Sequence, residues 1–448
     1  MIDDGRDRLR HLARVVSILC LALGVTRWVV AASRSYLNPD EAWKFTVASL
    51  PTWTDSLDKA SELLHPPLLT IWLRSSLLVY DSELWMRLPS IAFAAAAIGF
   101  VYAWLQRAAG TAAGLAALAI LVASPSMASA ATEVREYGGL LFFSAVALYA
   151  NQRFVAAPSH RWLVAASLAL AGGFLTHHAT AWVAVALGAF VPLALRERCQ
   201  AGRWWRRWAV AQSLLVLLAA WTVFGYGDEY IVGAGASAAD VAWVQAGFPR
   251  AQETFLGFAG DRLVAVWQRS VGGPIVGALG IPLFVLGVVW FAWWSCRRAG
   301  TAAGGRSFAL LIVAPLALGV AVGWLRIYPF GALRQTDFVL PFLAAGMGLG
   351  IAAAVRGRAA PAAVIALAIA VAGTLTSAPA NDPSVMPRAD IHAALRYVDE
   401  SVPTEAPLFT DNQTRFLLHY YWRERGVTRV AGEPNTWRFG TRTVVAPR

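Results

Sequence analysis

The chain has 448 residues, of which 57% are hydrophobic and only 15% are charged, against the roughly 25% charged residues usual for soluble domains. This composition excludes an ordinary soluble protein. The net charge of +11 does not indicate nucleic-acid binding, because the arginines lie in short loops between apolar runs and not on one aromatic-rich surface. The cysteines, Cys20, Cys199 and Cys296, have the spacing of neither a zinc site nor a disulfide framework.

Apolar runs long enough to cross a bilayer recur along most of the chain. Each covers about 17 to 25 residues, the length that a hydrocarbon core of roughly 30 Å requires. We therefore predict an all-α polytopic membrane protein with about eleven transmembrane helices, the first of them uncleaved. The predicted spans are 14–32, 84–105, 110–127, 138–154, 162–177, 179–195, 208–226, 272–294, 307–325, 336–355 and 359–377.

Residues 65–80 form a shorter apolar run that Arg74 interrupts. If this segment does not cross, the N-terminal arginines and the cluster at 196–207 lie on one side, which the positive-inside rule makes cytoplasmic. If it crossed, these clusters would face outward. We therefore predict that it lies in the interface or re-enters, within a first external loop at 33–83 that contains interfacial helices. The protein then lies in the plasma (inner) membrane with a cytoplasmic N-terminus.

The end of the chain differs in composition from the rest. Residues 381–448 have the charge content of a soluble segment and contain helix-like and strand-like stretches. They predict a small non-cytoplasmic α/β appendage that follows a transmembrane domain at 1–380.

Candidate functional residues gather on the predicted external side. Asp40 and Glu41 follow Asn38 and Pro39, a turn-favouring pair that would end the first helix at the membrane surface. An isolated acidic pair there is most simply a solvated helix end, but further polar residues reach the same face. They are His65, Arg87, Glu133, Arg135, Tyr137, His177, His178, Arg326 and Arg334.

The order of the motifs resembles a known family. The DE pair at 40–41 is followed by HPPL (65–68), RLPS (87–90), EVREYG (133–138), THH (176–178) and YPFGALRQTDFVLPFLA (328–344). Together they resemble the GT-C membrane glycosyltransferases, specifically the bacterial relatives of protein O-mannosyltransferases and lipid A aminoarabinose transferases. The resemblance implies a GT-C fold and transfer of a sugar from a polyprenyl-phosphate donor, at the non-cytoplasmic face, to an acceptor that is a protein, a lipid or a polysaccharide.

The resemblance also implies roles for the acidic residues. Asp40 would be the catalytic base with Glu41 beside it, because an inverting transfer needs one carboxylate to accept the proton of the acceptor hydroxyl. Glu133 stands where relatives carry a second acidic residue, commonly an aspartate. Whether Glu133 binds the acceptor, the donor or a metal stays open.

The departing lipid phosphate needs cationic stabilisation more than it needs a proton. Arg135, Arg326 and Arg334 would supply it by bidentate contact with phosphate oxygens. Tyr137 is a further candidate phosphate ligand. For Arg326, Arg334 and Tyr137 a role as an interfacial anchor is an equal alternative.

The remaining candidates would support the site. The prolines after His65 fix its direction towards the sugar or the phosphate, although a helix-entry role is an equal alternative. Arg87 would pair with a first-loop carboxylate and so keep Asp40 ionised. No cofactor is firmly implied. A divalent metal held by His177, His178 and the carboxylates stays open as an alternative, although the spacing of these residues is not that of a known metal site.

Two other functions fit a chain with many spans, namely transport or flipping of lipid-linked glycans and non-catalytic binding of lipid-linked sugars. A transporter is expected to show charges deep within its spans and repeat-related broken helices. Here the polar residues gather at one face, and no duplicated hydropathy pattern is evident. The pattern favours a glycosyltransferase.

Overall fold

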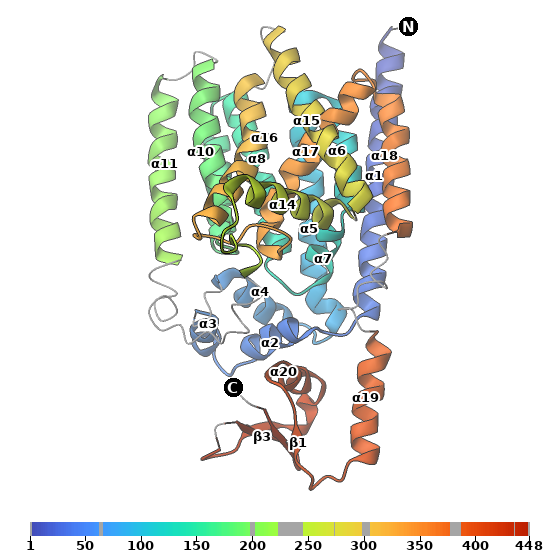
Figure 1. Cartoon of the computed structure of the whole chain (residues 1–448), viewed down its shortest axis with the longest axis vertical. Helices are drawn as coiled ribbons and strands as arrows, with labels where there is room; N and C mark the ends of the chain where they lie inside the picture. Colours follow the sequence, from blue (N-terminus) through green and yellow to red (C-terminus); the bar gives the residue numbers. More distant parts are fainter. Residues whose placement is uncertain are drawn as a thin grey trace.

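The computed structural model describes residues 2–61, 66–197, 202–222, 245–272, 274–297, 305–376, 387–433 and 435–446. Long helices form a bundle, and a small mixed unit lies at one of its ends (Figure 1). The N-terminus lies at the opposite end of the bundle (Figure 1).

Each predicted span overlaps a helix or, for 110–127, a bent pair of helices. These helices are α1 (Ile2–Arg34), α5 (Glu83–Ala109), α6 (Thr111–Ala123) with α7 (Pro125–Thr132), α8 (Tyr137–Ala156), α9 (His160–Phe174), α10 (Thr180–Glu197), α11 (Gly202–Ala220), α15 (Pro274–Arg297), α16 (Gly305–Trp324), α17 (Leu340–Ala354) and α18 (Ala359–Thr376). Within the described ranges, seven helices are long and apolar enough to cross a bilayer, or eight if the bent pair α6–α7 is one broken span. The chain is a multi-pass membrane protein, and its total number of spans stays a prediction.

Small residues bring helices of the bundle into close contact. A Cβ atom on Gly287 of α15 would lie 2.1 Å from the carbonyl oxygen of Gly346 in α17. A Cβ atom on Gly350, one turn further along α17, would lie 2.1 Å from the carbonyl oxygen of Leu283. Packing of this kind replaces the hydrophobic effect as the force that holds helices together in lipid.

Three short helices follow α1 and lie at the same end of the bundle as the C-terminal unit: α2 (Pro39–Ala48), α3 (Trp53–Ser61) and α4 (Pro67–Leu77) (Figure 1). Helix α4 has 11 residues, whereas a crossing helix needs about 20. Arg74, which interrupts the apolar run, donates hydrogen bonds to the carbonyls of Ala48, Leu50 and Pro51 and so ties α4 to the turn after α2. The prediction that 65–80 does not cross is consistent with this geometry.

Three further elements lie between the long helices. Helix α14 (Phe255–Trp267) continues into the π-helical turn η2 (Gln268–Gly272), and the 3₁₀ helix η3 (Arg334–Val339) leads into α17. The break between α6 and α7 lies at Ser124, whose hydroxyl donates a 2.6 Å hydrogen bond to the carbonyl of Ser270 in η2. The bend of α6–α7 is thereby fixed against η2.

The C-terminal unit is the predicted α/β appendage. Its elements are α19 (Arg388–Ser401), β1 (Leu408–Phe409), α20 (Asn412–Tyr421), η5 (Arg423–Arg425), β2 (Val427–Arg429), β3 (Thr436–Phe439) and β4 (Arg442–Val445). The strand order is β1-β4-β3-β2, with β1 parallel to β4 and the other pairs antiparallel. The domain boundary predicted at 380 and 381 lies outside the described residues.

Helix α20 packs on α2. Phe45 and Tyr420 meet edge to face with ring centroids 4.9 Å apart, inside a buried cluster that also contains Leu37, Ala42 and Leu417. The appendage therefore covers α2, the helix whose first turn contains Asp40 and Glu41.

Candidate active site

Glu41 is a buried carboxylate whose two oxygens both accept hydrogen bonds. Its side chain returns to the backbone N–H of Asn38 at 2.8 Å, while the Asn38 side chain accepts from the Glu41 N–H at 3.0 Å, which is a capping box at the start of α2. Arg87 donates to both carboxylate oxygens, at 3.0 and 2.8 Å, and the N–H of Val134 donates at 2.7 Å. Glu41 is 1% exposed, so its lone pairs are used and no substrate reaches it in this arrangement.

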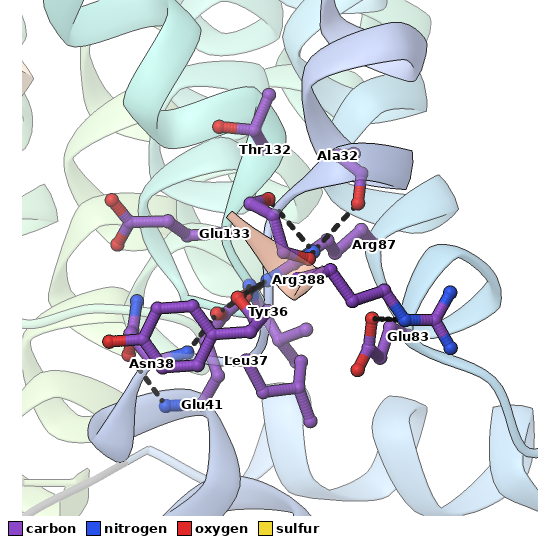
Figure 2. A network of polar contacts seen from close by, with 12 residues as sticks. Ala32, Tyr36, Leu37, Asn38, Glu41, Glu83, Arg87, Thr132, Glu133 and Arg388 are labelled. Carbon is purple, nitrogen blue, oxygen red and sulfur yellow. Dashed lines mark hydrogen bonds and ion pairs between the residues drawn. The ribbon is translucent and has the colours of Figure 1, made fainter. Parts of the chain in front are cut away.

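Arg87 joins three elements through one guanidinium group. Besides Glu41, it donates to the carbonyls of Ala32 at 2.7 Å, Ser35 at 3.0 Å and Tyr36 at 2.7 Å (Figure 2). These carbonyls belong to the end of α1 and the link that follows it, where helix geometry leaves acceptors without partners. The first-loop carboxylate that Arg87 contacts is Glu41, whereas Asp40 has a different partner.

Asp40 lies next to Glu41 but faces outward. Its side chain is 57% exposed and forms an ion pair with Arg135, whose side chain is 13% exposed. Arg135 belongs to the segment 133–137, which links α7 to α8 and ends with Tyr137, the first residue of α8. Of the two adjacent carboxylates, Asp40 is the one that is open to solvent.

Glu133 and Arg334 form a second ion pair at 2.8 Å. Glu133 also accepts a 2.6 Å hydrogen bond from the hydroxyl of Ser129, one turn earlier in α7. Burial raises the pKa of Glu133 above its usual value, although the charge of Arg334 opposes this shift. The end of α7 and the start of η3 are thus held together beside Arg135.

Lys44 and Glu136 form a third pair that the motif analysis missed. The Nζ of Lys44 lies 3.5 Å from Oε2 of Glu136, and both side chains are buried. Burial lowers the pKa of Lys44 to about 8, and the nearby carboxylate of Glu136 limits this shift. One signal was present in the sequence, because Lys44 is one of only two lysines in the chain and lies four residues after Asp40.

A fourth pair, also missed, lies behind Arg334. The Nε of Arg269 in η2 is 3.6 Å from Oδ1 of Asp337, which is buried. Asp337 follows Arg334 by three residues in η3, and positions i and i+3 of a 3₁₀ helix lie on one face. Within the motif at 328–344, the sequence predicts a role for Arg334 and none for Asp337.

The ring of Tyr137, at the end of the segment 133–137, packs against the ring of His177. Their ring centroids are 5.2 Å apart and both side chains are buried. The Nδ1 of His177 accepts a 3.0 Å hydrogen bond from the backbone N–H of Ala179, which places a ring proton on Nε2. His178 follows in the same turn between α9 and α10.

The other two predicted site residues, Arg326 and His65, are not part of these ion pairs and ring contacts in the described structure. Arg326 is exposed and donates a 2.9 Å hydrogen bond to the carbonyl of Pro249. His65 lies outside the described residues. Within the ranges that the structure describes, no three His, Cys, Asp or Glu side chains are grouped so as to hold a metal ion.

Residues 64–226 match the profile of the family described as dolichyl-phosphate-mannose-protein mannosyltransferase. A comparison with curated protein sequences found no significant match.

Solved structures of membrane enzymes are similar to this chain. ArnT from Cupriavidus metallidurans bound to undecaprenyl phosphate has 14% identity and a TM-score of 0.54, and the match covers 91% of this chain and 84% of that one. The apo state of the same protein gives 16% identity, a TM-score of 0.53 and the same coverage. The apo oligosaccharyltransferase of Archaeoglobus fulgidus gives 12% identity and a TM-score of 0.50, over 91% of this chain and 59% of that one. The chain has the GT-C fold, and the resemblance inferred from its motifs to glycosyltransferases of the protein O-mannosyltransferase and aminoarabinose transferase type is confirmed.

Proposed function

We propose that this protein is an inverting glycosyltransferase that moves a sugar from a polyprenyl-phosphate donor to an acceptor at the non-cytoplasmic membrane face. The family match, the GT-C fold and the undecaprenyl phosphate bound in the similar structure of ArnT support this proposal. The observation that carries it is the exposed carboxylate of Asp40 against the guanidinium group of Arg135. A base and a phosphate-binding cation then lie side by side.

Asp40 is the proposed base. It accepts the proton of the acceptor hydroxyl while that oxygen forms a bond to the anomeric carbon of the sugar. The bond between the anomeric carbon and the phosphate oxygen breaks on the opposite side, and its electron pair leaves with the polyprenyl phosphate. Asp40 suits this task better than Glu41, because Glu41 is buried and saturated with donors.

Arg135 and Arg334 are the proposed ligands of the donor phosphate. Both lie on the segments that meet beside Asp40, and each pairs with a carboxylate, Asp40 and Glu133 respectively. A phosphate can replace these carboxylates because guanidinium groups bind both anions in the same bidentate manner. Arg326 is a weaker candidate, since it is bonded to Pro249.

Glu41, Arg87, Glu133, Tyr137 and His177 are proposed to support these groups. Glu41 and Arg87 hold the first turn of α2, and therefore Asp40, against α1, α5 and Val134. Glu133 directs Arg334, and the Tyr137 and His177 rings pack behind the segment 133–137. Fixed neighbours of this kind keep a catalytic group within the small tolerance that chemistry needs.

The proposed sidedness follows from the positions of the two ends. Helices α2 to α4 and the appendage lie at one end of the bundle, and the arginine-rich N-terminus lies at the other (Figure 1). Asp40 lies in the first turn of α2. The positive-inside rule makes the N-terminal end cytoplasmic. The site then faces the non-cytoplasmic side, where a lipid-linked donor and a water-borne acceptor can meet.

The test is sugar transfer by the purified protein in lipid nanodiscs, with a panel of polyprenyl-phosphate sugars and with Asp40→Asn as the matched variant. Transfer by the wild type is expected, with a loss of about 10² to 10⁴ in kcat for Asp40→Asn. Equal turnover of a folded Asp40→Asn variant would overturn the assignment of the base. Donor binding without transfer would indicate a binder, and donor translocation in proteoliposomes would indicate a flippase.

A further inference from the structure

Two ion pairs of opposite polarity connect α2 to the segment 133–137. Asp40 of α2 pairs with Arg135, and Lys44 of α2 pairs with Glu136. Asp40 and Lys44 are four residues apart and share one face of the helix. Between them, Glu41 accepts the hydrogen bond from the N–H of Val134. Three residues of α2 thus hold three successive residues of the neighbouring segment.

The two ion pairs differ in exposure. The side chains of Lys44 and Glu136 are 5% and 7% exposed, whereas in the other pair Arg135 is 13% and Asp40 57% exposed. A pair with one solvent-exposed partner gains less from its mutual attraction than a pair buried on both sides, because water screens the exposed charge. Breaking a buried pair leaves a charge without compensation, which is costly. The Asp40–Arg135 pair is therefore the one that can open, and the Lys44–Glu136 pair is the one that stays.

The proposed reaction requires the exposed pair to open. While Asp40 and Arg135 contact each other, the carboxylate is not free for the acceptor hydroxyl, and the guanidinium is not free for the donor phosphate. Once they separate, α2 loses one of its links to the segment 133–137. Catalysis nevertheless needs Asp40 and Arg135 to stay close to their places.

We propose that Lys44 and Glu136 are positioning residues, whose pair keeps α2 docked on the segment 133–137 while Arg135 exchanges Asp40 for the donor phosphate. The inference rests on the proposed function and adds to it the order of two events. Donor binding releases Asp40, and only then does the carboxylate accept the acceptor proton.

The ionisation of Lys44 gives this role a pH dependence. The charged groups that act on Lys44 are Glu136, Arg135 and Asp40, and His177 lies near the same cluster. Burial lowers the pKa of Lys44 from 10.5 to about 8. The ion pair, and with it the activity, is expected to fall as the pH rises through that value.

Stability is expected to respond to the same titration with the opposite sign. Because the native state loses the Lys44 proton before the unfolded chain does, this titration adds stability as the pH rises from about 8 towards 10.5. A loss of activity above pH 8 without a loss of stability from this group therefore distinguishes positioning from a structural role.

The experiment compares Lys44→Met, Glu136→Gln, the double variant and Lys44→Arg in the full chain, with transfer activity measured from pH 6 to 10. Each single variant is expected to lower kcat at least about tenfold, and the double variant to lose no more than either single one, because they remove one shared contact. Lys44→Arg is expected to retain the wild-type activity and to show no decline of activity near pH 8, since arginine stays charged. The control is Lys59→Met, which changes the only other lysine, an exposed residue of α3.

Wild-type kcat in Lys44→Met, additive losses in the double variant, or an unchanged decline in Lys44→Arg would each overturn the inference. A second readout does not depend on sugar transfer or on the folding of a variant. Acetylation of the two lysines in the wild type is followed by mass spectrometry, with and without polyprenyl phosphate. Lys44 is expected to stay at least about tenfold less reactive than Lys59 in both states. Rapid acetylation of Lys44 when polyprenyl phosphate is bound would overturn the positioning role and leave the proposed function standing.

Discussion

The hydroxyl of Tyr421 donates a 2.6 Å hydrogen bond to Oε1 of Glu83, and so connects the C-terminal appendage to the first turn of α5 across 338 positions of the sequence. The same hydroxyl accepts a 3.1 Å hydrogen bond from the N–H of Leu37. The Nε of Arg388 lies 3.1 Å from the other oxygen of Glu83. Leu37 directly precedes Asn38, the N-cap of α2, so the appendage holds the start of the helix whose first turn contains Asp40.

Tyr421→Phe tests this connection. The variant leaves the buried carboxylate of Glu83 with one donor fewer, and loss of a hydrogen bond to a charged group costs about 1.5 to 3 kcal/mol. We expect a lower midpoint of thermal unfolding and a lower kcat, because the entry to α2 loosens. Tyr397→Phe, at an exposed position of α19, is the control and is expected to change neither value. An unfolding midpoint for Tyr421→Phe equal to that of the control would show that the contact contributes nothing to docking.

The adjacent carboxylates Asp40 and Glu41 are expected to respond differently to amide substitution. Asp40→Asn should abolish most of the activity while changing stability by about 0.5 kcal/mol or less, as surface substitutions usually do. Glu41→Gln leaves Arg87 buried without its counter-charge, and breaking a buried pair costs about 3 to 5 kcal/mol. Chemical unfolding and transfer rates on the two proteins check this contrast. The roles assigned here would have to be exchanged if Asp40→Asn proved the less stable variant and Glu41→Gln the less active one.

Arg334 and Arg326 are both candidate phosphate ligands from the sequence, and they have different surroundings in the structure. Arg334 pairs with Glu133 beside Arg135, whereas Arg326 is bonded to the carbonyl of Pro249. We expect Arg334→Gln to weaken the binding of polyprenyl phosphate about tenfold or more, with a smaller effect of Arg326→Gln. Titration calorimetry in nanodiscs measures both affinities. The opposite ranking would place the phosphate near Arg326.

The contact between α15 and α17 depends on glycine. Gly287→Ala would place a methyl group 2.1 Å from the carbonyl oxygen of Gly346, so the helices must separate. Overpacking of this kind costs about 1 to 3 kcal/mol. Gly99→Ala in α5 is the matched control, because a Cβ atom there meets nothing within 4 Å. Thermal unfolding in detergent should show destabilisation of the first variant only, and equal midpoints would mean that α15 and α17 do not need this close approach.

The membrane architecture was predictable from the sequence because it depends on local composition. An apolar run of sufficient length forms a helix in lipid, where every backbone group must be satisfied within the segment. Charge parity also predicted that 65–80 does not cross, and α4 is short, as that prediction requires. The α/β character of the appendage followed in the same way from its periodicity.

The pairing of the charged residues was not predictable from hydrophobic length, loop charge or motifs. Motifs placed Asp40, Glu41, Arg87, Glu133 and Arg135 on one face, but they did not decide which carboxylate meets which arginine. The structure assigns Arg87 to Glu41 and Arg135 to Asp40. It also brings in Lys44, Glu136, Arg269 and Asp337, which lie outside the chosen site residues, because burial and distance, not motif membership, decide which side chains interact.

The sequence by itself determined that this protein lies in a membrane and where its helices run, since these properties depend on hydrophobic length and composition. Only the tertiary structure decided that Asp40 is exposed while Glu41 is sealed. That difference arises where α2 packs between α5, the segment 133–137 and α20, and contacts between elements so distant in sequence leave no local pattern.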